Sequence, residues 1–223
     1  QATGELSDPD KLASAIRKEN PRVVVVVGLG VAKQLIPILS DIPMVFCMAN
    51  NPAKHKLKQN HTTGVFLEPD PAEQLKAFSR LLPKAKRIGV IYDETASGRF
   101  VTSAQRAARA LGIKLDTIRV EQASQIPGAL RQLSARVDAL WLLRDARVMS
   151  RAFFEQTILL QYNRKLPVLA YSDQFVRKGA LASYSSSYRQ QGGMAAKLCK
   201  ALLAGKTADE LAVVPPEGHL SIN

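Results

Sequence analysis

One stretch near the start of the sequence reads Val23-Val24-Val25-Val26-Val27-Gly28-Leu29-Gly30-Val31-Ala32. Five consecutive valines are typical of a strand that is covered on both faces, because β-branched side chains suit a pleated sheet and no position alternates to a polar residue. The glycines that follow predict a tight turn, and the apolar spacing from 31 to 39 predicts a helix after it. The stretch is therefore a strand–turn–helix unit, the building block of parallel sheets.

The same unit recurs along the chain. Strands are predicted at residues 44–48, 62–67, 87–92, 114–120, 138–143, 167–171 and 179–184, with two proline-interrupted strands at 212–214 and 219–222. Helices are predicted between them, for example after the start signal Asp70-Pro71-Ala72-Glu73 and over residues 188–203. Repeated strand–helix units with short connections predict an α/β fold with two Rossmann-like lobes, each built on a parallel sheet.

A junction at Pro83-Lys84-Ala85-Lys86 separates two series of these units. We expect an N-terminal lobe over residues 1–83, a C-terminal lobe over 84–209, and a tail over 210–223 whose strands return toward the N-terminal lobe. A chain of 223 residues is long enough for two such lobes. No run approaches the ~18 apolar residues that a membrane-spanning helix needs.

The chain is basic, with 31 Lys and Arg against 19 Asp and Glu and a formal net charge of +12. Such an excess raises the question of nucleic acid. The densest basic segment, Lys54-His55-Lys56-Leu57-Lys58, is short and has no aromatic residue between its cations. Other basic residues fall on predicted solvent faces of helices. We interpret the charge as a dispersed surface property and expect no nucleic-acid partner.

Neither of two common enzyme motifs is present. A dinucleotide-binding turn has a third glycine where Lys33 stands, and an acidic residue about 20 positions on, where this sequence has Met48, Ala49 and Asn50. The Gly-x-Ser-x-Gly elbow of hydrolases is absent from the sequence. We therefore expect no enzyme and no cofactor, with a nicotinamide-dependent enzyme as a disfavoured alternative.

The histidines and cysteines give no metal-binding pattern. His55, His61 and His219 fall in predicted loop or tail segments without metal-ligand spacing, so no metal site is expected. Cys47 and Cys199 fall in an apolar strand and an apolar helix, where buried inert thiols are the usual outcome. The alternative is a disulfide between the lobes, which requires the fold to bring the two cysteines together.

Open α/β sheets bind ligands just beyond the carboxyl ends of their strands. The residues at these positions supply turn amides, hydroxyls, aromatic rings and one carboxylate, but no nucleophile–base pair. That composition suits a binding cleft better than an active site. The segments are 28–31, 48–51, 92–97, 144–145, 171–175 and 184–187.

Several blocks resemble the substrate-binding proteins of bacterial ABC transporters, in particular the branch related to tryptophan- and tyrosine-type uptake proteins. They are the glycine turn with Ile42-Pro43-Met44-Val45-Phe46, the block Leu82-Pro83-Lys84-Ala85-Lys86-Arg87-Ile88-Gly89-Val90-Ile91-Tyr92, and Lys165-Leu166-Pro167-Val168 followed by Gly179-Ala180-Leu181-Ala182-Ser183-Tyr184. The resemblance runs along nearly the whole chain. It implies the type I periplasmic-binding-protein fold, in which two α/β lobes joined by hinge strands close over a small ligand.

The resemblance also implies that the N-terminal lobe lacks a first strand–helix unit before Gln1, and that family members continue past Asn223. Two departures fall near the implied ligand. Leu29 replaces the usual threonine, and Tyr92-Asp93-Glu94-Thr95-Ala96-Ser97 differs from the family pattern. We therefore expect a small polar ligand, with an amino acid as the leading example and not necessarily an aromatic one.

The expected function is that of an extracytoplasmic, periplasmic solute-binding protein, a monomer that delivers its ligand to an ABC permease in the membrane. Backbone N–H groups of Gly30 and Val31 are expected to receive an anionic or carbonyl group, and Asp145 to pair with an ammonium. Flat apolar contact and further hydrogen bonds are expected from Tyr92, Tyr171, Phe175, Ser97 and Asn50. The alternative is a ligand-sensing domain of a receptor or transcriptional regulator with the same fold.

Overall fold

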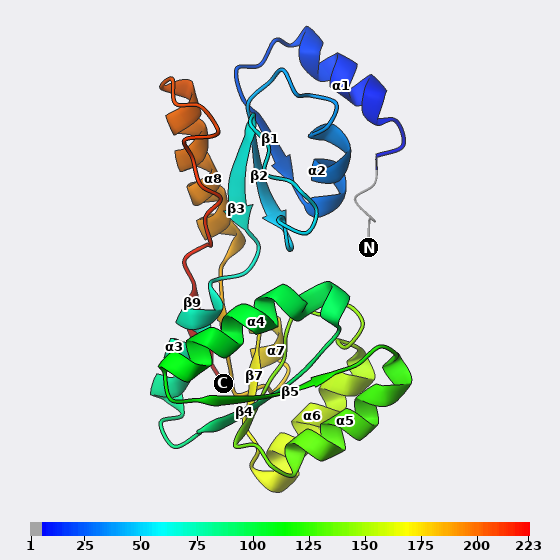
Figure 1. The fold of residues 1–223 in the computed structure, drawn as a ribbon, viewed down its shortest axis with the longest axis vertical. Coiled ribbons are helices and arrows are strands. Elements are labelled where there is room, and N and C mark those ends of the chain that lie inside the picture. Colours follow the sequence, from blue (N-terminus) through cyan, green and yellow to red (C-terminus); the bar gives the residue numbers. More distant parts are fainter. Residues whose placement is uncertain (1–5) are drawn as a thin grey trace. The chain divides into compact units, whose positions relative to one another are not determined.

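The computed structural model describes residues 6–223, so the first five residues of the expected N-terminal lobe lie outside the described part. The chain divides into two compact units. Unit 1 takes in the residues up to Pro69 together with Ser186–Glu217, and unit 2 takes in Asp70–Ser185 together with Gly218–Asn223 (Figure 1). Both units are α/β with parallel strands, so the predicted fold class is confirmed.

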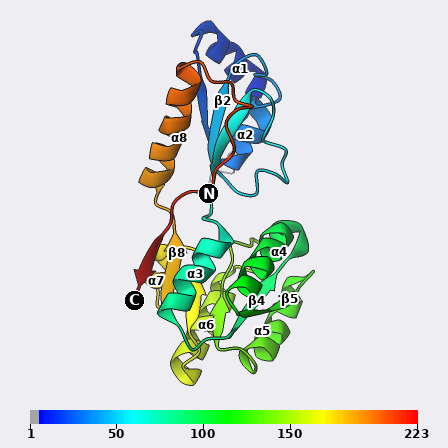
Figure 2. The same cartoon turned by 60° about the vertical axis from the view of Figure 1, so that its left-hand side comes forward.

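A three-stranded parallel sheet forms the centre of unit 1. Its strands lie in the order β1 (Val24–Val27), β2 (Met44–Ala49) and β3 (Thr62–Phe66). Among the described residues of unit 1, three helices accompany it: α1 (Pro9–Lys18), α2 (Leu29–Leu35) and α8 (Tyr188–Leu203). In both views of the molecule, α8 lies on one side of this sheet and α2 on the other (Figures 1 and 2).

Alternate side chains of β2 serve the two faces of this sheet. Met44 and Phe46 are buried in a cluster with residues of α1 and α2. Val45 and Cys47 point the other way, into a cluster with residues of α8. Since successive strand side chains point to opposite faces, an all-apolar strand needs cover on both sides, and two groups of helices supply it for β2. The same expectation is wrong for the edge strand β1, where Val25 and Val27 on one face are 50% and 56% exposed.

Gly64 in β3 is required by close packing of the neighbouring strand. A Cβ at this position would lie 2.3 Å from the carbonyl oxygen of Phe46 and 2.5 Å from its ring. Backbone atoms of a paired strand cannot withdraw without breaking the ladder of hydrogen bonds. Only glycine therefore allows the register in which Phe46 of β2 lies opposite Gly64 of β3.

We expect Gly64→Ala to destabilise unit 1 by at least about 2 kcal/mol, because the new methyl group meets strand backbone. Scanning calorimetry with circular dichroism measures the loss. The matched control is Gly128→Ala, where an added Cβ meets nothing within 4 Å in a helix of unit 2. That change should be neutral or stabilising by up to about 1 kcal/mol. Equal melting of the two variants would contradict the assignment.

Unit 2 contains a six-stranded sheet. Its strands follow the order β5 (Lys114–Arg119), β4 (Arg87–Tyr92), β6 (Ala139–Trp141), β7 (Val168–Ala170), β8 (Ala182–Ser185) and β9 (His219–Ile222). All neighbours are parallel except β9, which runs antiparallel to β8.

Helices cover both faces of this sheet. The helices are α3 (Pro71–Leu81) and α4 (Glu94–Ala110) on one face, α5 (Ile126–Ser134) and α6 (Arg151–Arg164) on the other, with a 3₁₀ turn η1 (Ala123–Gln125) and the short α7 (Asp173–Val176). Trp141, the only tryptophan in the sequence, is buried with its ring 5.9 Å from Phe78 and 5.6 Å from Phe100. Its fluorescence therefore reports on unit 2 alone.

The structure divides the chain differently from the expected boundaries at 83/84 and 209/210. Helix α3 belongs to unit 2, because Leu75 and Phe78 pack on β4 and α4. Helix α8 belongs to unit 1, because Ala195 and Leu202 pack on the outer face of β2. An amphipathic helix joins whichever sheet buries its apolar face, and sequence order alone does not identify that sheet. The tail also differs from the expectation that its strands return toward the N-terminal lobe. Val214 forms only a single bridge to Val65 of unit 1, and β9 is wrongly placed by that expectation, because it pairs with β8 in unit 2.

Both cysteines lie in unit 1, so the alternative of a disulfide between lobes is wrong. Cys47 on β2 and Cys199 on α8 are free and belong to the same apolar cluster. Burial is the main cause that raises the pKa of both thiols. A thiol that stays protonated at neutral pH is a poor nucleophile, which agrees with the expected inert role.

Asp173 joins α7 to strands β8 and β9. Its Oδ1 accepts hydrogen bonds from the hydroxyls of Ser183 at 2.8 Å and Ser185 at 2.7 Å, and its Oδ2 lies 2.9 Å from Nε2 of His219. Burial alone would raise the pKa of this carboxyl, but the hydrogen bonds from Ser185, Ser183 and His219 outweigh that effect and lower the pKa to about 2. The carboxylate therefore stabilises unit 2 only while it is ionised.

We expect unit 2 to lose stability as the pH falls from about 4 toward 2. The folded pKa of Asp173 lies below its ordinary value, so its contribution is complete above the unfolded pKa and is lost as pH falls through about 2. Roughly 2 kcal/mol is an upper bound, because the side chain is 31% exposed. Urea unfolding followed by Trp141 fluorescence should show Asp173→Asn less stable at neutral pH and equal to wild type near pH 2. A constant gap at all pH values would refute this.

Candidate functional site

The loops that follow β4, β5, β6 and β7 gather at one edge of the sheet in unit 2, because parallel strands end on the same side. Five of the eight predicted ligand residues belong to these loops or to the strand and helix ends beside them: Tyr92, Ser97, Asp145, Tyr171 and Phe175. The other three, Gly30, Val31 and Asn50, follow β1 and β2 in unit 1. The prediction thus falls on the carboxyl edges of two separate sheets.

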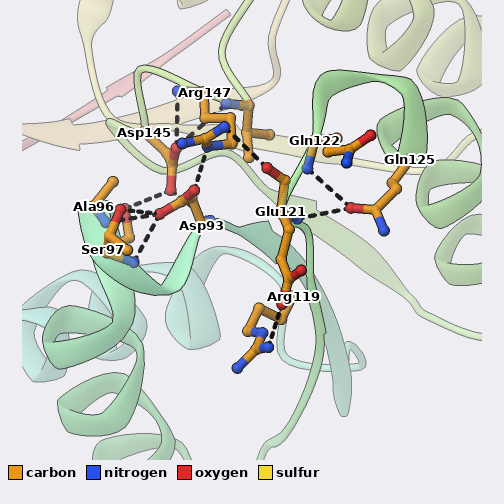
Figure 3. A network of polar contacts seen from close by, with 11 residues as sticks. Asp93, Ala96, Ser97, Arg119, Glu121, Gln122, Gln125, Asp145 and Arg147 are labelled. Carbon is orange, nitrogen blue, oxygen red and sulfur yellow. Dashed lines mark hydrogen bonds and ion pairs between the residues drawn. The ribbon is translucent and has the colours of Figure 1, made fainter.

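Asp145 is the centre of the polar network in Figure 3, and it is 1% exposed. One carboxylate oxygen accepts hydrogen bonds from Asp93 N and Ser97 Oγ, both at 2.8 Å. The other accepts from Arg147 N at 3.1 Å and Val148 N at 3.3 Å. A carboxylate offers about four lone-pair sites, and four donors occupy them here. Asp145 is therefore engaged in holding two loops together, and no lone pair is left for the ammonium predicted from the sequence.

Asp93 forms the second half of this network and is 3% exposed. As N-cap of α4 it accepts hydrogen bonds from Thr95 N at 2.7 Å and Ala96 N at 3.0 Å, and its other oxygen pairs with the Arg147 guanidinium. The pKa of Asp93 is lowered, mainly by the hydrogen bond from the Thr95 hydroxyl. Burial acts in the opposite direction, but the Thr95 hydroxyl, the N–H donors and Arg147 together outweigh it. Asp93 thus stays ionised at the start of a helix, where a negative charge is favourable.

A third loop is tied in by Arg147 and Gln125. The Arg147 guanidinium donates to the carbonyl oxygen of Glu121 at 2.9 Å. The Gln125 side chain accepts from the N–H groups of Glu121 and Gln122 at 2.7 and 3.0 Å, which closes the turn before α5 (Figure 3). The loops after β4, β5 and β6 are therefore linked before any ligand arrives, and a preformed rim costs less ordering entropy on binding.

Beside this network lies an aromatic platform. The guanidinium carbon of Arg144 lies 4.5 Å from the centre of the Tyr171 ring. The Tyr171 and Phe175 rings are 4.9 Å apart, and Phe175 lies 4.9 Å from Phe154. Tyr171 and Phe175 are both half-buried. A cation over an aromatic face is attracted to the ring quadrupole, and the arrangement places a positive charge on a flat apolar surface.

The remaining predicted residues have simpler surroundings. Tyr92 is half-buried at the end of β4, and burial first, then Glu94, raise the pKa of its phenol. In unit 1, Gly28 adopts φ +94° at the turn into α2, which favours glycine over any L-residue. Helix α2 has only 7 residues, so the field at Gly30 and Val31 is weaker than a long helix would give. Asn50 follows β2 and is half-buried.

Other kinds of site find no support in the part of the chain that the structure describes. No group of three or more His, Cys, Asp or Glu side chains is placed to hold a metal ion. No helix among residues 6–223 combines the length and apolar character needed to cross a membrane. Hollows of about 850 and 790 Å³ lie at the amino ends of the strands, beside residues 56–61 in unit 1 and 164–167 in unit 2, away from the loops considered above.

Four residues of this edge were not among the predicted ligand contacts: Asp93, Arg144, Arg147 and Phe154. The role of Asp93 could be predicted from the sequence, since aspartate directly before a helix is a preferred N-cap residue. Arg144 follows a strand and belonged to the segments at strand ends. The roles of Arg147 and Phe154 could not be predicted from the sequence, because their partners are distant in sequence and only the fold brings them together.

Two α/β units, between which the chain passes three times, and preformed loops at the carboxyl edges of parallel strands define the class of type I periplasmic binding proteins. The particular family is shown by a match to the family model described as ABC transporter substrate binding protein, which covers residues 1–223. The chain belongs to that family.

Similar proteins agree with this assignment. The chain is 23% identical over 222 residues to a tyrosine-binding protein of Clostridioides difficile (strain R20291), covering 95% of this chain and 63% of that relative's length. A ligand-free, open substrate binding protein with adhesive properties from Clostridium difficile matches with TM-score 0.78 and 21% identity, over 96% of this chain and 75% of that one. An ABC domain from Streptococcus pneumonia in complex with L-Trp matches with TM-score 0.65 and 22% identity, over 97% and 78%. At these identities the two solved structures establish the fold alone.

We expect Asp145→Ala to destabilise unit 2 by about 3 kcal/mol, since it leaves four donors without an acceptor, three of them on buried residues. Asp145→Asn keeps one carbonyl acceptor and should lose less. Denaturant unfolding followed by Trp141 fluorescence measures both. Glu155→Ala, which removes an exposed carboxylate paired with Arg151 in the same unit, is the control and should change little. If Asp145→Ala proves as stable as Glu155→Ala, the network does not hold the loops.

Proposed function

We propose that this chain is the solute-binding protein of an ABC uptake system and binds an amino acid, with aromatic ones as the first candidates. The observation that carries the proposal is the match of all residues 1–223 to the substrate-binding family. Two similar proteins support the ligand class, one named for tyrosine and one with L-Trp bound. The family and its relatives are binding proteins, so the chain is assigned a binding function without chemistry.

The aromatic platform supplies the proposed ligand contacts in unit 2. Tyr171 and Phe175 present half-buried rings to a flat apolar group, and Arg144 adds a positive charge suited to a carboxylate. Tyr92 extends the apolar wall. Asp145 and Ser97 act in this proposal through the loops that they hold, because their hydrogen bonds are used within the network. Contacts from Gly30, Val31 and Asn50 stay predictions, as does a ligand cleft between the lobes.

The partners in this proposal are a small solute and an ABC permease in the membrane, with the chain acting as a monomer in the periplasm or another extracytoplasmic space. No nucleic acid and no cofactor take part. The alternative, a ligand-sensing domain, uses the same fold and ligand edge but passes the signal to another domain or subunit. Light scattering with and without L-tryptophan separates the two: a monomer in both conditions favours transport, whereas a ligand-dependent dimer favours sensing.

The proposal predicts that isothermal titration calorimetry detects binding of at least one member of a panel of L-tryptophan, L-tyrosine, L-phenylalanine and L-leucine. Tyr171→Ala should weaken that binding about tenfold or more, because it removes a ring and the surface on which Arg144 lies. Tyr162→Ala is the matched control, since Tyr162 is 61% exposed on α6 of the same unit. It should bind as wild type does.

Two outcomes would overturn the proposal. Absence of binding across the amino-acid panel, with a folded protein by circular dichroism, would remove the assigned ligand class. Equal affinities of Tyr171→Ala and wild type would show that the aromatic platform is not part of the site.

A further inference from the structure

The chain passes between the two units at three places: after Pro69, after Ser185 and after Glu217. Any change in the orientation of one unit to the other has to be absorbed by backbone dihedral angles near these crossings. The residues that can do so most readily are those outside the strands, helices and caps of either unit. The contacts on either side of each crossing therefore identify the hinge residues.

At the second crossing, both flanks are held close to the boundary. Ser185 ends β8, is paired with His219 of β9, and donates its hydroxyl to Asp173 at 2.7 Å. Ser187 is the N-cap of α8 and shares a reciprocal capping box with Gln190, at 3.1 Å from Ser187 Oγ to Gln190 N and 2.9 Å from Ser187 N to Gln190 Oε1. Ser186 is the one residue between these two anchors.

At the third crossing, the fixed points are Val214 and His219. Val214 N donates to Gly64 O at 3.0 Å, and Val214 O accepts from Phe66 N at 2.9 Å. Pro215 and Pro216 follow, and their rings fix φ near −65°. Adjustment is therefore confined largely to Glu217 and Gly218, before His219 joins the sheet of unit 2.

The first crossing is held from both sides as well. The carbonyl oxygen of Leu67 accepts a hydrogen bond from the side chain of Gln191 at 3.1 Å, and Gln191 is 1% exposed on α8. On the other side, Asp70 is the N-cap of α3 and accepts from Ala72 N at 2.7 Å. Gln191 thus ties the first crossing to the start of α8, which follows the second.

We propose that Asp173 is the positioning residue of this hinge: its carboxylate holds the ends of the second and third crossing strands together on unit 2, so that Ser186 acts as the main pivot. The geometry that carries this is one side chain bonded to Ser183, Ser185 and His219, which lie immediately before and after the two crossings. Without it, Ser185 and His219 keep their backbone pairing but lose the side-chain connection to α7. More backbone then becomes free to move, and a wider range of unit orientations is populated.

The test uses double electron–electron resonance spectroscopy to measure the distribution of distances between one spin label on each unit, without any ligand. Spin labels are attached at Lys33→Cys on α2 and Gln132→Cys on α5, both exposed positions in different units, with Cys47 and Cys199 replaced by alanine. Asp173→Asn should broaden the distribution by about 1.5-fold. The matched control is Asp116→Asn, which loses an ion-paired carboxylate on β5 of the same unit, remote in the sheet order from β8 and β9. It should leave the width unchanged.

A second variant keeps the test independent of the stability of Asp173→Asn. Ser186→Pro restricts the proposed pivot to one φ value and should narrow the distribution. The inference is overturned if Asp173→Asn and Asp116→Asn give the same width, or if Ser186→Pro leaves the distribution as in wild type.

The consequence for solute capture rests on the proposed function. Titration with L-tryptophan and L-tyrosine should show about fivefold weaker binding by Asp173→Asn, because the binding-competent orientation is a smaller fraction of a broader set. Wild-type protein that binds neither amino acid but shows the predicted widths would overturn the proposed ligand and support the hinge. Binding weakened by Asp173→Asn with unchanged widths would overturn the hinge and leave the ligand assignment standing.

Discussion

The need of β2, the central strand of the unit 1 sheet, for apolar cover on both faces governs the organisation of this chain. Helices α1 and α2 cover one face of β2, but the other face, with Val45 and Cys47, is covered by α8 and by the segment after it, which follow the whole of Asp70–Ser185 in sequence. Burying apolar side chains is worth roughly 25 cal/mol per Å², so leaving that face open would be costly. The chain must therefore leave unit 1, build unit 2 and return.

The return of the chain has two structural consequences. The chain crosses between the units three times, whereas a simple passage from one domain to the next needs one crossing. It also places β9 antiparallel beside β8, because the final segment enters unit 2 from the direction opposite to that of the crossover-connected strands. The third partner of Asp173 comes from this last strand, since His219 is the residue with which β9 begins.

Local pattern was sufficient to predict most of the elements. The predicted strand at 87–92 and the predicted helix at 188–203 coincide with β4 and α8, and the fold class followed from the alternation of such units. Caps and β-branched runs are local, and their physics is complete within a few residues. Assignment of α3 and α8 to their units was not predictable in this way. An apolar helix face shows that a helix packs against something, but the sheet that receives it is a property of the tertiary structure.

The candidate site shows the same limit at the level of single side chains. Strand ends correctly placed Ser97, Asp145, Tyr171 and Phe175 at one edge, because the carboxyl ends of parallel strands share it. The role of Asp145 could not be predicted, since two of its donors, Asp93 N and Ser97 Oγ, are 52 and 48 residues away in sequence. A buried carboxylate requires hydrogen-bond donors, and here the protein itself supplies four. This use of Asp145 fits the proposed function: the edge is ordered by its own network, so a ligand bound at the proposed aromatic platform would have little loop entropy to remove. In the proposed hinge, motion is left to the few residues at the crossings that lie outside the strands, helices and caps of both units. The rigid edge and the proposed hinge are complementary. Because little binding free energy would be spent on ordering the loops, more of it would shift the population toward the orientation of the units that the ligand favours.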